Sequence, residues 1–127
     1  MTAVPAHILL VEDDEPLSAI LAAHLGARGY RVTVAPTAEA ATALLVDSLR
    51  PDIVVLDINL PGETGWSVVR SDALIRAGDP PVVVASAMSV SPVRLREYGV
   101  AGYLPKPFAL ETLTTTIDRL LSLEKDA

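Results

Sequence analysis

Residues 53–57, Ile-Val-Val-Leu-Asp, form an unbroken apolar run that ends on a carboxylate, and this run indicates the fold class of the chain. Four consecutive aliphatic residues without polar alternation are typical of a β-strand that is buried on both faces. Such strands belong to parallel sheets that helices cover on both sides. Three other short apolar runs lie at residues 8–11, 82–85 and 101–104. We therefore expect several buried parallel strands, with Asp57 at the carboxyl end of one of them.

Segments with apolar residues at helical spacing alternate with these runs and with a further strand-like run at residues 31–35. Asp14 and Thr37 are suitable helix N-caps, and Gly29 is a suitable stop. The helices that these signals predict cover residues 15–28, 38–49, 65–78, 93–98 and 110–123. Residues 60–65 are expected to form a turn. The alternation of five strands and five helices predicts an α/β fold, because parallel neighbours need crossover connections.

The length and charge of the chain limit the classes of protein to consider. Its 127 residues fit a single domain, residues 1–127, with a core from about residue 7 to residue 123. The formal net charge is −6 and the ten Lys and Arg residues are scattered, so we expect no direct binding of nucleic acid by this chain.

The composition also bears on the compartment. There is no cysteine, which excludes disulfide and thiol chemistry and agrees with a reducing cytoplasm. The first six residues do not resemble a signal peptide, and no apolar run approaches the roughly 20 residues of a membrane helix. We expect a soluble cytoplasmic protein that does not interact with a membrane.

Polar groups stand at the ends of four apolar runs. They are Glu12, Asp13 and Asp14 after the first run, Asp57 after residues 53–56, Ser86 after residues 82–85 and Lys106 after residues 101–104. In a parallel sheet all of these ends lie at the same edge, which is where open α/β sheets bind their ligands. Acids, a hydroxyl and an ammonium at that edge predict a site for a metal and a phosphoryl group.

The acidic residues have ordinary explanations as well as functional ones. An Asp at a strand end often only starts a turn, and Asp14 fits a helix cap better than a site. Glu12 and Asp13 would face Asp57 if their strands are neighbours. Carboxylates so close together need a cation or raised pKa values. Oxygen ligands without Cys or His favour a hard ion, and a few carboxylates plus waters suit Mg2+.

Lys106 lies between Pro105 and Pro107, so its backbone is stiff. A cis bond before Pro107 would hold the lysine in a fixed direction. Lysines at strand ends are usually solvated, but a positioned ammonium is a good partner for a phosphoryl oxygen. The Ser86 hydroxyl could bond to the same group. Together these residues predict phosphoryl transfer to the Asp57 carboxylate.

Four motifs resemble the receiver domains of response regulators in bacterial two-component signalling. They are residues 9–17 (Leu-Leu-Val-Glu-Asp-Asp-Glu-Pro-Leu), residues 55–65 (Val-Leu-Asp-Ile-Asn-Leu-Pro-Gly-Glu-Thr-Gly), Ser86 with Ala87, and residues 102–108 (Gly-Tyr-Leu-Pro-Lys-Pro-Phe). The resemblance covers residues 7–123. It implies a flavodoxin-like, doubly wound, five-stranded parallel sheet with strand order 2-1-3-4-5.

The resemblance also implies a reaction. Asp57 is expected to accept a phosphoryl group from a histidine kinase or a phosphotransfer protein. The expected cofactor is Mg2+, held by Asp13, Asp57 and the backbone carbonyl of Asn59, with Glu12 acting through a water. Lys106 is expected to bind the phosphoryl group. Beyond phosphorylating and dephosphorylating itself, the chain is not expected to be an enzyme.

Further residues are implied in the switch that follows phosphorylation. Ser86 and the backbone of Ala87 are expected to bind the phosphoryl group, and Ser86 is expected to move together with Tyr103. This movement would change the face made by helix 4, strand 5 and helix 5, which would control an output domain or partner, or form a homodimer. Asn59 and Met88 border the site and are expected to tune the lifetime of the phosphoryl group.

Two alternatives stay open. The segment from Ser86 to Gly99 is about two residues shorter than the family leads us to expect, which predicts a short or irregular fourth helix. A degenerate receiver that only binds partners or dimerises without phosphorylation therefore remains an alternative. A Mg2+-dependent phosphohydrolase would need a second carboxylate two residues after the nucleophile, where this chain has Asn59.

Overall fold

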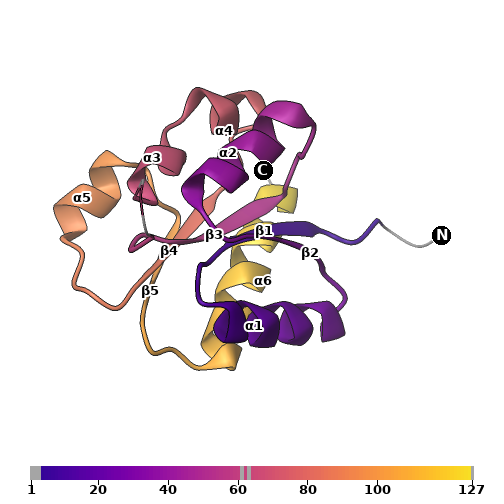
Figure 1. Cartoon of the computed structure of the whole chain (residues 1–127). Coiled ribbons are helices and arrows are strands. Elements are labelled where there is room, and N and C mark those ends of the chain that lie inside the picture. The colour runs from indigo at the N-terminus through magenta and orange to yellow at the C-terminus, as the bar shows by residue number, and fades with distance from the viewer. Residues whose placement is uncertain (1–3, 61, 63, 127) are drawn as a thin grey trace.

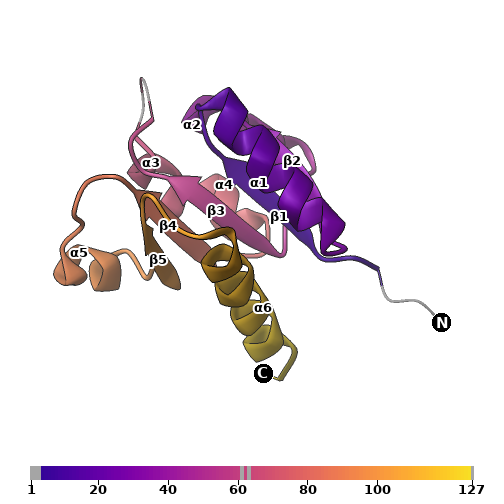
Figure 2. The same ribbon diagram turned by 90° about the horizontal axis from the view of Figure 1, so that it is seen from below.

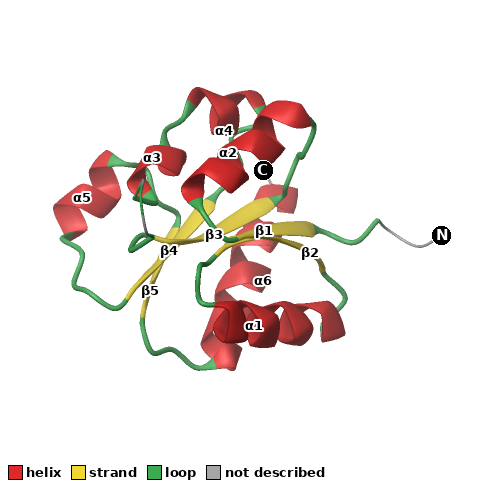
Figure 3. Ribbon diagram, viewed as in Figure 1, coloured by secondary structure: helices red, strands yellow, loops and turns green. Residues whose placement is uncertain are grey.

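The computed structural model describes residues 4–60, 62 and 64–126 (Figure 1). Its centre is one parallel sheet in the order β2-β1-β3-β4-β5, as predicted. The strands are β1 (His7–Val11), β2 (Arg31–Ala35), β3 (Ile53–Asp57), β4 (Val82–Ser86) and β5 (Gly102–Pro105). Helices cover both faces of this sheet, with α1 and α6 on one side and α2, α3 and α4 on the other (Figures 1 and 3). The doubly wound α/β fold is therefore confirmed.

The described residues form six helices, where the sequence predicted five. They are α1 (Glu15–Ala27), α2 (Ala38–Asp47), α3 (Trp66–Val69), α4 (Asp72–Arg76), α5 (Pro92–Glu97) and α6 (Leu110–Asp126). The single helix expected over residues 65–78 is wrong, because Ser71 interrupts it with an extended backbone. The Ser71 hydroxyl donates to the carbonyl of Val68 at 2.9 Å and accepts from the N–H of Leu74 at 3.1 Å. It thus ends α3 and caps α4.

The strands separate two apolar layers, because successive side chains point to opposite faces. In β1, Leu9 packs with the layer under α2, α3 and α4, while Leu10 packs with the layer under α1 and α6. In β3, Val54 and Val55 divide in the same way. Every residue of β3 and β4 is buried. The unalternating apolar runs at residues 8–11, 53–57 and 82–85 therefore become central strands, as expected, whereas the run at residues 101–104 becomes the partly buried edge strand β5.

The predicted helix caps at Asp14 and Thr37 and the predicted helix stop at Gly29 are confirmed. Asp14 accepts a hydrogen bond from the N–H of Leu17 at 3.0 Å, and Thr37 accepts one from Ala40 at 3.0 Å. Gly29, just after α1, has φ 95°, which a residue with a side chain rarely adopts. These caps set the direction in which α1 and α2 leave the carboxyl edge of the sheet.

The predicted turn over residues 60–65 includes Pro61 and Glu63, which lie outside the described residues. Gly62 within it has φ 76°, and the N–H of Gly65 bonds to the carbonyl of Ile58 at 3.0 Å. No helix in the described ranges has both the length and the apolar character needed to cross a membrane.

Helix α5 is short, as predicted, and it projects from the edge of the sheet beside β4 and β5 (Figure 2). None of its residues is buried. Rings and guanidinium groups attach it to α3. The Tyr98 ring lies 4.6 Å from that of Trp66, while Arg94 lies over Trp66 at 5.3 Å and Arg70 lies over Tyr98 at 5.4 Å. Such contacts are individually weak at exposed positions, and α5 itself contributes no buried side chain to the core.

Candidate functional site

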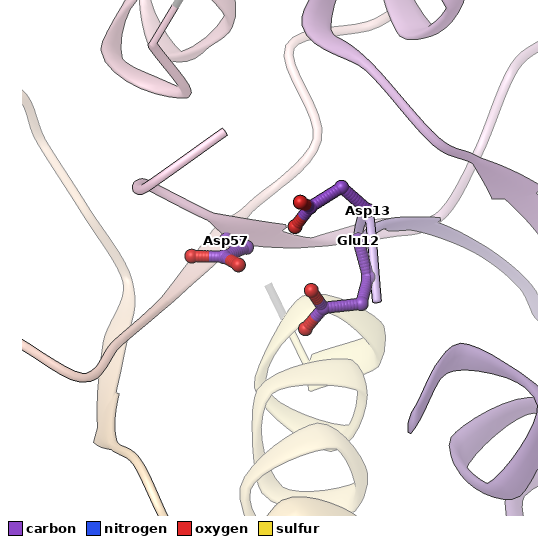
Figure 4. Close-up of side chains that lie close together, drawn as sticks. All are labelled: Glu12, Asp13 and Asp57. Atoms are coloured by element: carbon purple, nitrogen blue, oxygen red, sulfur yellow. The ribbon is translucent and has the colours of Figure 1, made fainter. Parts of the chain in front are cut away.

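Three carboxylates gather at the carboxyl edge of the sheet. Glu12 and Asp13 directly follow β1, and Asp57 is the last residue of β3 (Figure 4). The two strands are hydrogen-bonded neighbours, with Val11 paired to Leu56. This pairing brings one oxygen of each carboxylate within 4.8 Å of the others. The parallel register thus assembles an acidic cluster from two distant parts of the sequence.

The cluster offers ligands of one kind. Glu12 is 3% exposed and Asp57 is 6% exposed, whereas Asp13 is exposed to solvent. Carboxylate oxygens alone suit a hard cation, and an open side toward solvent suits an ion that retains several waters. The donor set and its spacing therefore fit Mg2+.

Lys106 brings a positive charge to the same cluster from the end of β5. Its Nζ lies 2.5 Å from Glu12 Oε1 and 3.1 Å from Asp57 Oδ2. Its backbone N–H bonds to the carbonyl of Ser86 at 2.8 Å, which fixes the segment against the end of β4. The Lys106–Pro107 peptide bond is cis. The ammonium thus bridges two buried carboxylates from neighbouring strands.

Glu12 and Lys106 shift each other's pKa values. Burial raises the pKa of Glu12, and the nearby charge of Asp57 adds to this, while the hydrogen bond from Lys106 opposes it. Burial alone would lower the pKa of Lys106, but its hydrogen bonds to Glu12 and Asp57 outweigh that effect and raise it. Lys106 therefore stays charged at neutral pH.

A second group of hydrogen bonds runs from Asp57 towards β5. The N–H of Asn59 donates to Asp57 Oδ1 at 2.9 Å, and its side-chain amide donates to Ser86 Oγ at 2.9 Å. Ser86 Oγ also accepts from the N–H of Met88 at 3.0 Å. The Tyr103 hydroxyl donates to the carbonyl of Met88 at 3.4 Å. Four residues predicted to bear on the switch or on phosphoryl lifetime are thus linked in one network.

In the described part of the chain, two cavities flank the strand ends. The larger, of 470 Å³, opens towards α5, and the smaller, of 280 Å³, opens towards α1 and α6. Asn59, Ser86 and Met88 line the first, while Ala87 and Lys106 line the second. Cavities therefore border the strand ends both on the side of α5 and on the side of α1 and α6.

Gly65 lies against the backbone of Asp57, although the sequence indicated only the end of a turn and the start of a helix there. A Cβ at this position would lie 2.5 Å from the carbonyl oxygen of Asp57 and 2.9 Å from the Cα of Ile58. Only glycine permits this close approach of two backbones. Gly65 is the last residue of the motif at residues 55–65, but the close approach that requires a glycine there is seen only in the folded chain.

The structure brings Glu12, Asp13, Asp57 and Lys106 into one cluster, and it places Asp14 outside as a helix cap. The two histidines are also outside. His7 pairs with Thr33 and His24 pairs with Thr114, and these contacts join structural elements. Sequence reasoning missed the contacts of Lys106 with Glu12 and of Asn59 with Ser86, because the residues in each pair are far apart in the chain.

Comparison with known proteins agrees with this geometry. Residues 8–118 match the family described as response regulator receiver domain. The chain belongs to this family. The match covers β2 to β5, all of β1 except His7, and the cluster at the carboxyl ends of the strands, so the receiver domain predicted from the motifs is confirmed.

Several known proteins resemble this receiver domain in sequence. Protein PetR of Rhodobacter capsulatus is 35% identical over 123 residues, which cover 95% of this chain and 51% of PetR. The transcriptional activator PfeR of Pseudomonas aeruginosa is 39% identical over 117 residues, which cover 90% of this chain and 37% of PfeR. The chain thus spans about half or less of the length of these relatives.

Solved receiver domains have the same fold. The CheY-like receiver domain of Methanospirillum hungatei superposes with a TM-score of 0.88 at 23% identity, covering 98% of this chain and 100% of that one. The non-phosphorylated HemR receiver domain of Leptospira biflexa gives 0.81 at 35% identity, covering 92% and 94%. The receiver domain is a module of two-component response regulators.

Proposed function

We propose that this receiver domain is a phosphorylation switch in which Asp57 accepts a phosphoryl group from a histidine kinase or a phosphotransfer protein. The observation that carries the proposal is the pairing of a buried Asp57 carboxylate with the Lys106 ammonium at 3.1 Å, beside Glu12 and Asp13. A carboxylate at a strand end becomes an effective acceptor when fixed positive charge stands where the phosphoryl oxygens arrive.

The proposed reaction is in-line transfer. An oxygen of Asp57 forms a bond to phosphorus while the bond from phosphorus to the donor's histidine nitrogen breaks. Lys106 already contacts Asp57 and can exchange that contact for one to a phosphoryl oxygen. The N–H of Asn59 holds the other Asp57 oxygen, which orients the carboxylate. Ser86 is the last residue of β4 and Ala87 follows it, and we propose that the Ser86 hydroxyl and the backbone of Ala87 bind the phosphoryl group.

We propose Mg2+ as the cofactor, with Asp13, Asp57 and the carbonyl of Asn59 as ligands and Glu12 acting through a water. The support is the oxygen-only donor set within 4.8 Å. When bound, such an ion neutralises charge on the transferring group. It would also offset the repulsion among the three carboxylates, which Lys106 offsets only in part.

The output is proposed to arise at the face formed by α5, β5 and α6. These are the predicted helix 4, strand 5 and helix 5, because the predicted third helix is divided into α3 and α4. Phosphorylation adds charge and acceptor oxygens next to Ser86, and Tyr103 lies at the other end of the same hydrogen-bond network. A change in this network would alter the face that an output domain, a partner protein or a second copy reads. We propose a protein partner, and not nucleic acid, for this acidic chain, and the cysteine-free sequence suits the cytoplasm as its compartment.

Incubation with acetyl phosphate and Mg2+ tests the proposal. Mass spectrometry should show one added phosphoryl group, which maps to Asp57 and disappears in Asp57→Asn and on chelation of Mg2+. Asp47→Asn, an exposed carboxylate in α2, is the matched control and should be phosphorylated like the wild type. An unmodified wild-type protein under these conditions would refute the proposal.

The degenerate receiver is the second candidate, and the short α5 without a buried residue is the observation that favours it. If Asp57→Asn leaves partner binding and output unchanged, this candidate replaces the first. A phosphohydrolase is disfavoured because Asn59 stands where the second carboxylate would be required.

A further inference from the structure

Asn59 makes two contacts that tie the acceptor to the sensor. Its backbone N–H donates to Asp57 Oδ1, and its side-chain amide donates to Ser86 Oγ, both at 2.9 Å. The first contact orients the carboxylate and would persist in any variant at this position, because it comes from the backbone. The second contact depends on the amide alone. The proposed Mg2+ site uses only the backbone carbonyl of Asn59, so metal binding does not account for the contact between its side chain and Ser86.

The Ser86 hydroxyl is bonded to two groups outside the Asp57 carboxylate. Its oxygen accepts from Asn59 Nδ2 and from the N–H of Met88, at 2.9 Å and 3.0 Å. A serine oxygen has two acceptor positions, so both are occupied. Ser86 is 2% exposed, so water does not readily replace either partner. Within the described ranges, no hydrogen bond joins Ser86 to the Asp57 carboxylate.

Met88 connects Ser86 to Tyr103. The backbone of Met88 holds Ser86 through its N–H and accepts the Tyr103 hydroxyl through its carbonyl at 3.4 Å. A displacement of Ser86 therefore disturbs the segment after β4, and with it the anchor of Tyr103. The amide of Asn59 is the side-chain end of this series, and the backbone N–H of the same residue contacts the carboxylate that would be phosphorylated.

We propose that the Asn59 side chain is a latch that holds the Ser86 hydroxyl in its unphosphorylated position. The inference rests on the proposed phosphorylation of Asp57 and deepens it. A phosphoryl oxygen carries negative charge and is a stronger acceptor than neutral groups. When the Ser86 O–H donates to it, Ser86 Oγ turns towards Asp57 and gives up its bond from Asn59. Because that bond exists only before phosphorylation, Asn59 acts as a positioning residue that opposes activation.

Titration with beryllofluoride in the presence of Mg2+ tests the latch, because this probe forms a phosphoryl-like adduct on a carboxylate and its affinity does not depend on hydrolysis. Asn59→Ala should bind beryllofluoride roughly two- to tenfold more tightly than the wild type, as expected for the loss of one neutral hydrogen bond from the unliganded state. Unchanged or weaker binding, measured by calorimetry, would overturn the proposal.

A double-mutant cycle separates the latch from a general change in the site. In a Ser86→Ala background the hydroxyl is absent, so adding Asn59→Ala should leave the affinity nearly unchanged. An undiminished effect in that background would also overturn the latch. Ser89→Ala removes a polar group from the same cavity and should match the wild type. If the wild type binds no beryllofluoride, the proposed function fails and the latch fails with it. If the wild type binds and Asn59→Ala does not tighten binding, only the latch fails.

Discussion

Replacing Lys106 with Met should destabilise the fold, although the residue lies at the functional edge. The side chains of its two partners, Glu12 and Asp57, are 3% and 7% exposed, while that of Lys106 is 17% exposed. Methionine keeps the unbranched stem and removes the charge. Breaking a buried ion pair by removing one partner costs about 3–5 kcal/mol, because an uncompensated charge remains. Since this ammonium is partly solvated and Asp13 opens the cluster to water, we expect the lower end, about 3 kcal/mol.

Urea unfolding in the presence of a chelator is the suitable assay, because a divalent cation would replace part of the lost charge. The fluorescence of Trp66, the only tryptophan, and circular dichroism should report the same transition. Arg96→Met removes an exposed cation from α5 and serves as the control, with an expected change within about 0.5 kcal/mol.

The cycle with Glu12→Gln decides whether the ion pair is the cause. If Lys106 stabilises the fold by neutralising Glu12, the cost of Lys106→Met should fall by about 1 kcal/mol or more in the Glu12→Gln background. An equal cost in both backgrounds would refute this reasoning. So would a Lys106→Met protein as stable as the wild type.

Two other measurements test separate features of the fold. Gly65→Ala places a Cβ 2.5 Å from the carbonyl oxygen of Asp57, so the backbone must shift. We expect a loss of about 1–3 kcal/mol in the free energy of unfolding and slower phosphorylation by acetyl phosphate. Wild-type stability and phosphorylation in this variant would contradict the close approach. Burial and the charge of Arg31, opposed by Asp52, lower the pKa of His7 below 6.5. Its stabilising contribution is therefore present above pH 6.5 and lost as the pH falls through the lowered value, so His7→Gln should show a smaller loss of stability in urea titrations between pH 7 and pH 5.

Much of the fold follows from local sequence. Residues 53–57 become a fully buried central strand because a parallel sheet with helices on both faces has no polar side. Asp14 and Thr37 cap helices as predicted, because capping depends on a few neighbouring residues. The prediction of one undivided helix over residues 65–78 was wrong, and the cause is again a local interaction. The Ser71 hydroxyl competes for the backbone, and apolar spacing does not reveal this competition.

The sequence by itself determined which chemical groups stand at the strand ends and that they meet at one edge, because parallel strands all end there. It also identified the family through motifs that lie at those ends. Only the tertiary structure decided how the groups pair. Lys106 reaches Glu12 across 94 positions of sequence, and Asn59 reaches Ser86 across 27. Such contacts depend on strand register and on distances of a few ångströms between side chains, which the spacing of residues along the chain does not specify.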